Sequence, residues 1–212
     1  FINGKWFLNR KETVIDIQWS TMRDLEGALE EPVYELMSTR HPLFRMISPK
    51  IPWLNERMLT DLVDGFISVG NMTEAELKKI KCLELVQGVL RPMQCVQKVK
   101  NQYRFIWDKN HSVLVKAIEF SLEKNQYCLD DTQIEMEKGE FGLPKMLFNF
   151  LIWSLCKSEH YTAIRDSLEV NADKLSFQNI ESITLLKKSP TLSEYQFNKL
   201  LDFYFIGSYK SG

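Results

Sequence analysis

The sequence predicts a mainly α-helical fold, an irregular bundle of about nine helices that follows a short N-terminal β-hairpin. Apolar residues recur at three- and four-residue intervals over most of the chain after Ser20. Residues 1–19 instead alternate apolar and polar side chains, which is the two-residue period of a half-buried strand. We find no repeat of fixed period, so a regular solenoid is disfavoured.

The segment 143–156 is predicted to be the central helix of this bundle. It opens with Pro144, which suits the first turn of a helix because its missing N–H costs nothing there. Apolar side chains then occupy every side of the cylinder, so the helix must be buried or in a membrane. It is too short for a bilayer, which requires roughly 20 residues. We therefore expect this segment to lie in the core and to supply shape rather than reactivity.

The first nineteen residues carry the clear strand signal. Ile15, Ile17 and Trp19 are separated by polar residues, and the polar run 9–12 precedes them as a turn. We therefore expect a hairpin over 1–19 and a helical domain over 20–212, which together form a single domain. Because the sequence begins with Phe1 rather than Met, we expect it to be a fragment of a larger protein.

Caps and prolines delimit the helices expected after the hairpin. Ser20 or Thr21 can cap the first helix, and Pro32 is expected to end it. Thr73 and Glu76 form a capping box. The main helices are expected over residues 20–31, 53–69, 73–107 with a kink or a break at Pro92, 112–124, 143–156, 159–170, 175–188 and 192–206, and short ones over 33–39 and within 125–142.

The overall charge does not indicate a nucleic-acid partner. Lys and Arg number 27 against 28 Asp and Glu, which gives a net charge of −1. The charge is nevertheless uneven, because residues 73–109 hold eight basic and four acidic side chains, whereas residues 110–142 hold three and seven. This asymmetry is expected to orient a binding partner.

The four cysteines predict a reducing environment. They are Cys82, Cys95, Cys128 and Cys156, and no two lie close in sequence. We expect buried, reduced thiols in an intracellular protein of the cytoplasm or nucleus. The sequence contains no signal peptide or membrane-spanning segment, so no membrane association is expected.

Neither a metal site nor a catalytic motif is apparent. The sequence has no Cys-x-x-Cys pair, and Cys156 and His160 lack a second pair of zinc ligands. The histidines lie outside known catalytic motifs, and no glycine-rich phosphate loop is present. We therefore predict a protein without catalytic residues, metal or cofactor; an enzyme with a dispersed site is the most distant alternative.

The segment 97–109 interleaves basic and aromatic side chains, a mixture suited to phosphate contacts and base stacking. Its candidate nucleic-acid-binding residues are Lys98, Lys100, Arg104 and Lys109. If the segment is helical, Lys100 and Arg104 lie together, whereas Lys98 and Lys109 lie on the opposite side. This division of the cations favours an ordinary solvated face over a nucleic-acid interface.

Two apolar features indicate a protein partner. Phe105 lies on the polar face of the expected helix 92–107, so its ring should contact another element of the chain or a partner. The last helix is apolar around most of its circumference, and Phe203 and Tyr204 are its candidate anchors. Burial of this helix in its own bundle is the alternative that the sequence favours.

The function predicted from these features is that of a non-catalytic helical protein–protein interaction module, or scaffold, within a larger assembly. Its partner is expected to be another protein, which the sequence does not identify. The alternative is a helical domain that binds nucleic acid through the segment 97–109.

Overall fold

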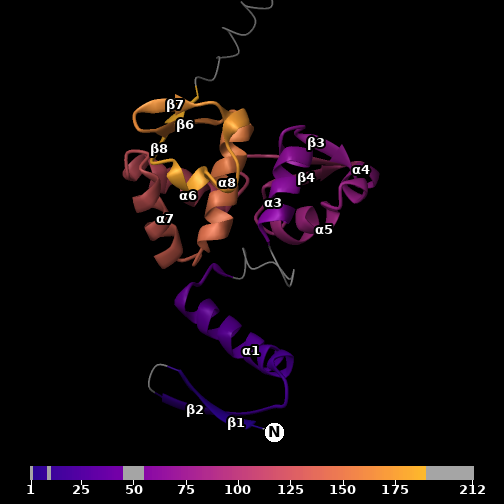
Figure 1. The fold of residues 1–212 in the computed structure, drawn as a ribbon, viewed down its shortest axis with the longest axis vertical. Helices are drawn as coiled ribbons and strands as arrows, with labels where there is room; N and C mark the ends of the chain where they lie inside the picture. The colour runs from indigo at the N-terminus through magenta and orange to yellow at the C-terminus, as the bar shows by residue number, and fades with distance from the viewer. Residues whose placement is uncertain (1, 9–10, 45–54, 190–212) are drawn as a thin grey trace, which may run out of the picture.

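The computed structural model describes residues 2–8, 11–44 and 55–189 of the chain. Figure 1 shows three parts: an N-terminal arm at one end of the molecule, and two units that lie next to each other. The arm contains an antiparallel hairpin of β1 (Ile2–Leu8) and β2 (Lys11–Trp19), followed by helix α1 (Met22–Arg40). The hairpin agrees with the alternation that predicts it.

The first unit, residues 55–107, is a helix–turn–helix with a β-hairpin packed beside it. Its helices and strands, in chain order, are α3 (Glu56–Leu62), the π-helical turn η1 (Val63–Ile67), β3 (Asn71–Thr73), α4 (Glu74–Lys79), α5 (Leu83–Leu85), the π-helical turn η2 (Val86–Leu90), β4 (Val96–Val99) and β5 (Gln102–Phe105). The three strands form an antiparallel sheet in the order β3-β5-β4. In this order of elements the β4–β5 hairpin directly follows the helix–turn–helix, and we call this hairpin the wing.

The second unit, residues 112–188, repeats this order of elements. It consists of α6 (Val113–Lys124), α7 (Leu129–Lys138), α8 (Lys145–Lys157), β6 (Tyr161–Arg165), β7 (Leu168–Val170), the 3₁₀ turns η3 (Ala172–Lys174) and η4 (Ile180–Ser182), and β8 (Leu185–Lys188). Cys128 forms a bridge to Leu185 of β8, on the edge opposite β6. It thus occupies the place of β3, while β6 and β8 correspond to β4 and β5.

The units differ in what joins these last two strands. In unit 1 the connection is the tight turn at residues 100–101, whereas in unit 2 it is an insert over residues 166–184 that contains β7, η3 and η4. Because the repeat lies in the topology and the inserts differ in length, it produces no fixed period in the sequence.

Helix α8 is the centre of the core, as the apolar segment 143–156 predicts. Every residue from Leu147 to Cys156 is buried. The helix contacts η1 of unit 1 as well as α7, β6, η3 and η4 of its own unit. The two units therefore share one continuous hydrophobic core.

The prediction of a nine-helix bundle is wrong, because the fold is mixed α/β. The described residues form seven α-helices and two three-stranded antiparallel sheets besides the N-terminal hairpin. Strands replace the helices expected over 92–107 and 159–170, and 3₁₀ turns and β8 replace the one expected over 175–188. The reason is that a short apolar run fits both periods, and burial of one sheet face decides between them.

The expected end of the first helix at Pro32 is also wrong. Helix α1 continues through this residue to Arg40, starting from a capping box between Thr21 and Asp24. The expected helix 192–206 lies outside the described residues.

His41 joins the arm to unit 2. Its Nδ1 lies 2.6 Å from the carbonyl oxygen of Gly139, and the Leu43 amide donates to the carbonyl of Glu140. The imidazole is buried against Gly142, which has a left-handed φ of 57°. A Cβ at residue 142 would lie 2.6 Å from two ring carbons of His41.

A Gly142→Ala substitution should therefore lower the free energy of unfolding by roughly 1–3 kcal/mol, through left-handed strain and the collision with His41. Urea denaturation measures this change, and amide hydrogen exchange at residues 41–44 reports whether the joint has loosened. Gly70→Ala is the control, since Gly70 also has a positive φ, of 84°, but nothing within 4 Å of an added Cβ. Equal losses in the two variants would exclude a specific contribution from the His41 contact.

Candidate nucleic-acid interface

The basic and aromatic segment 97–109 folds as the wing of unit 1 and not as a helix. Register pairs Lys98 with Tyr103 and Gln97 with Arg104. Successive residues of a strand point to opposite faces, so the helical grouping of the four cations is wrong. Tyr103 and Phe105 point into the core, whereas Arg104 is exposed on the outer face.

Lys98 is held by the protein itself. Its Nζ lies 3.4 Å from Oε2 of Glu74 and 5.1 Å from the centre of the Tyr103 ring. Lys78 binds the other oxygen of Glu74 at 3.1 Å, and the hydrogen bond from Lys78, followed by that from Lys98, lowers the pKa of this carboxyl group. Lys98 and Lys78 are therefore both paired with Glu74 within unit 1.

The remaining cations of unit 1 and the residues that follow it are exposed and form no ion pair with a described residue. They include three of the sequence-predicted residues, Lys100, Arg104 and Lys109. They also include Lys79, Lys81 and Arg91, which lie outside the basic and aromatic segment 97–109. The excess of basic residues over 73–109 was the signal available for them.

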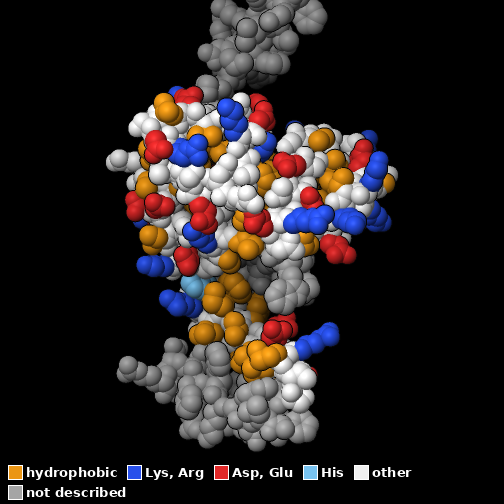
Figure 2. All heavy atoms as spheres, in the orientation of Figure 1, with side chains coloured by type: hydrophobic (Ala, Val, Ile, Leu, Met, Phe, Trp, Pro, Cys, Tyr) orange, Lys and Arg blue, Asp and Glu red, His pale blue; other side chains and the backbone are white. Residues whose placement is uncertain are grey.

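The fold brings these cations to the helix–turn–helix and the wing. Lys81 lies in the turn between α4 and α5, with a φ of 59°, and Lys100 lies in the turn of the wing, with a φ of 56°. Arg91 directly follows η2. Figure 2 shows Lys and Arg side chains in a row along the α5 side of unit 1.

Hydrogen bonds fix the wing against the helices. Gln87 Nε2 of η2 donates to the Tyr103 hydroxyl of β5 at 2.9 Å, and the Lys98–Glu74 pair joins β4 to α4. The positions of the exposed cations are therefore set by one folded unit and not by separate loops.

The predicted protein-binding residues have different positions. Phe105 is 9% exposed and packs in the hydrophobic core, which is the contact within the chain that the sequence left open. Phe203 and Tyr204 lie outside the described residues, so their contact with a partner stays a prediction.

Comparisons with protein families, curated proteins and solved structures find no match. The function must therefore be inferred from the fold and from the side chains that it exposes.

A cavity of about 570 Å³ lies in unit 2 beside β6 and β7 and is lined in part by Cys156, Tyr161 and Glu169. Burial raises the pKa of the Cys156 thiol to about 12, so the thiol is protonated at neutral pH. Burial likewise raises the pKa of Cys82 to about 11 and that of Cys95 to about 12. These buried thiols lack the thiolate that nucleophilic catalysis requires.

Two further observations concern metals and membranes. Within the described ranges, no three His, Cys, Asp or Glu side chains are grouped so that they could hold a metal ion. No helix in the same ranges has both the length and the apolar character needed to cross a membrane.

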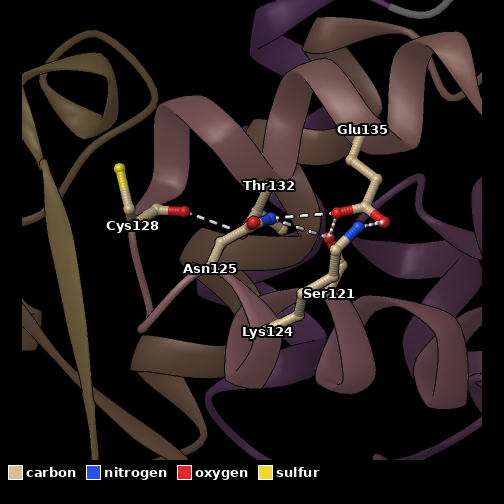
Figure 3. A network of polar contacts seen from close by, with 6 residues as sticks. All are labelled: Ser121, Lys124, Asn125, Cys128, Thr132 and Glu135. Atoms are coloured by element: carbon tan, nitrogen blue, oxygen red, sulfur yellow. Dashed lines mark hydrogen bonds and ion pairs between the residues drawn. The ribbon is translucent and has the colours of Figure 1, made fainter.

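A polar network between α6 and α7 uses its hydrogen-bonding groups internally (Figure 3). Glu135 Oε2 accepts from Ser121 Oγ at 2.9 Å and from Asn125 Nδ2 at 3.0 Å, while Oε1 pairs with Lys124 Nζ at 2.8 Å. Thr132 completes the network by donating to the Cys128 carbonyl at 2.7 Å. We interpret it as a structural link between the first two helices of unit 2.

The network should make stability depend on pH. The hydrogen bond from Lys124, aided by those from Ser121 and Asn125, lowers the pKa of Glu135 from its ordinary value of 4.5. The unfolded chain therefore takes up the proton at a higher pH than the folded chain does. The stabilisation is present above pH 4.5 and is lost as the pH falls through the folded-state pKa.

A Glu135→Gln variant should accordingly be less stable than the unaltered chain at neutral pH, by about 1 kcal/mol or less because the carboxylate is partly exposed. This difference in stability should shrink as the pH falls below 4.5, the ordinary pKa of a glutamate side chain. Urea denaturation at a series of pH values measures it. Glu137→Gln, an exposed change in the same helix, is the control, and the same pH dependence in both variants would contradict the role of the network.

Proposed function

We propose that the chain is a non-catalytic protein that binds double-stranded nucleic acid through the helix–turn–helix and wing of unit 1. The observation that carries this proposal is the set of exposed cations without ion-pair partners at the α4–α5 turn, after η2 and on the wing. A helix–turn–helix presents its second helix to a groove, while flanking residues contact the phosphates.

The charge of the whole chain does not oppose this function. Phosphate contacts depend on the local density of cations, and each contact releases counterions when the complex forms. Residues 73–109 hold eight basic and four acidic side chains, whereas acidic residues are in excess over 110–142. The acidic region is expected to turn unit 2 away from the duplex and so to orient the complex.

The test is a titration of a labelled random-sequence duplex with the chain, followed by fluorescence anisotropy at salt concentrations from about 50 to 200 mM. We expect the logarithm of the binding constant to fall linearly with the logarithm of the salt concentration. If six of the exposed cations contact phosphates, namely Lys79, Lys81, Arg91, Lys100, Arg104 and Lys109, the slope should approach about −5. No binding at the lowest salt concentration would rule out the proposal.

A contact with another protein is the second candidate, and helix α1 is the observation that favours it. None of its 19 residues is buried, and Met22 and Val33 are 69% and 41% exposed. Figure 2 shows hydrophobic side chains along this helix. An exposed apolar helix face of this kind is typical of a surface that packs against another chain.

A second copy of the chain is the partner for this surface that can be tested directly. If α1 mediates self-association, Val33→Glu should shift sedimentation towards the monomer and leave the free energy of unfolding within about 0.5 kcal/mol. Thr39→Glu, another exposed substitution in α1, is the control for added charge. A chain that sediments as a monomer at all concentrations would exclude self-association through α1.

A further inference from the structure

The exposed side of the second helix in the unit 1 helix–turn–helix carries three different hydrogen-bonding groups. Glu84, Gln87 and Arg91 are exposed, while the apolar residues between them are buried. A surface that binds phosphates alone would carry cations throughout. Here the lysines lie on both flanks, in the α4–α5 turn and the wing, and the helix presents a carboxylate, an amide and a guanidinium.

Gln87 is oriented by a buried side chain. Its Nε2 donates to the hydroxyl of Tyr103, which is 1% exposed. The amide then retains one free N–H and its carbonyl oxygen, because a glutamine carries two donors and one acceptor oxygen. This donor and acceptor are the pair that a glutamine uses to bind N7 and N6 of adenine in the major groove.

Arg91 and Glu84 have equally specific complements among the bases. A guanidinium binds O6 and N7 of guanine with two parallel hydrogen bonds, and a carboxylate accepts from N4 of cytosine. Glu84 also repels phosphates, so its presence on this helix weakens binding that is independent of sequence. The combination favours recognition of base edges over contact with the backbone.

The corresponding helix of unit 2 cannot do the same. By its place in the topology α8 matches α5 and η2, but its residues from Leu147 to Cys156 are all buried. The η3 and η4 turns of the insert 166–184 contact it. The insert therefore closes the surface that the short wing of unit 1 leaves open.

We propose that unit 1 reads base sequence in the major groove of B-form DNA through Glu84, Gln87 and Arg91, and that unit 2 has no reading helix. This inference rests on the proposed function and narrows its ligand to B-form DNA. A-form RNA is disfavoured because its major groove is too deep and narrow to admit these side chains.

The experiment selects sequences from a random-sequence DNA duplex library with the full chain and with Arg91→Ala and Gln87→Ala variants. The unaltered chain should enrich one short motif that contains guanine and adenine. Arg91→Ala should reduce the preference for guanine roughly 10- to 100-fold, and Gln87→Ala should do so for adenine. Gln87→Ala should keep its affinity for random DNA because it removes no charge, whereas Arg91→Ala also removes one exposed cation and should lose a small part of that affinity. Circular dichroism confirms that each variant is folded.

Double-stranded RNA of the enriched sequence is the second arm, and it should bind more weakly than the DNA. Salt-dependent binding of DNA without any enriched sequence would overturn this inference and leave the proposed function intact. A motif that both variants retain, or RNA that binds as tightly as DNA, would also overturn it. Failure to bind any duplex would overturn both proposals.

Discussion

A Lys81→Gln/Lys100→Gln double variant is expected to bind duplex DNA about 100-fold more weakly than the unaltered chain at about 0.1 M salt. Lys81 lies in the turn of the helix–turn–helix and Lys100 in the wing, so each is placed to contact a different phosphate. Neither forms an ion pair with a described residue, so the substitutions break no salt bridge in that part of the chain. The loss should therefore reflect the contacts with DNA.

Anisotropy titrations over a range of salt concentrations measure this effect. The slope of log K against log salt should become less steep by about 1.8, since each lost phosphate contact contributes about 0.9. A Lys116→Gln/Lys138→Gln variant is the matched control, because it removes the same charge from exposed positions of unit 2. If this control loses as much affinity, the cations act through net charge and not through the surface of unit 1.

Leu151→Ala is expected to lower the free energy of unfolding by roughly 2–5 kcal/mol. Leu151 is fully buried in α8, which contacts elements of both units. The cavity that the smaller alanine side chain leaves is therefore closed off from solvent. The loss would be a large part of the stability of a domain, which is typically about 5–15 kcal/mol. Urea denaturation measures it, with circular dichroism as the signal.

Met146→Ala is the control for this core variant, because Met146 belongs to the same helix but is 39% exposed. Its cost should be clearly smaller. If the two variants were equally stable, α8 would not be the centre of the shared core, and the packing of the two units against it would need a different explanation.

The central helix could be predicted because its signal does not depend on context. Pro144 at the N-cap and apolar side chains on every face define a buried helix wherever it packs. The capping box of Thr73 and Glu76 likewise marks the start of α4, since its two hydrogen bonds are local.

The sheets could not be predicted because their hairpin turns lack glycine, which is the strongest short-range signal of a hairpin. The wing turns at Lys100, with a φ of 56°, and the β6–β7 hairpin turns at Asp166 and Ser167, with φ of 51° and 64°. Asn101, Asp166 and Ser167 are common turn residues, but without a following glycine they are a weak signal of a hairpin. In addition, strands of three to five residues are too short for the two-residue period to stand out.

Only part of the candidate site could be predicted, because its residues come from separate segments of the chain. Lys100, Arg104 and Lys109 were recognised from the composition of one segment. Lys81 and Arg91 lie in other segments, and only the packing of the wing against the helix–turn–helix brings those segments together. Spatial proximity of this kind has no signature in a single sequence.

Amide hydrogen exchange of the full chain, with and without saturating duplex DNA, tests the central claim most directly. We expect slower exchange in α4, the α5–η2 helix and the wing, over residues 74–105, with α8 and the arm unchanged. Protection confined to unit 2 or to the arm, or no protection at a concentration that saturates binding, would contradict a nucleic-acid interface on unit 1.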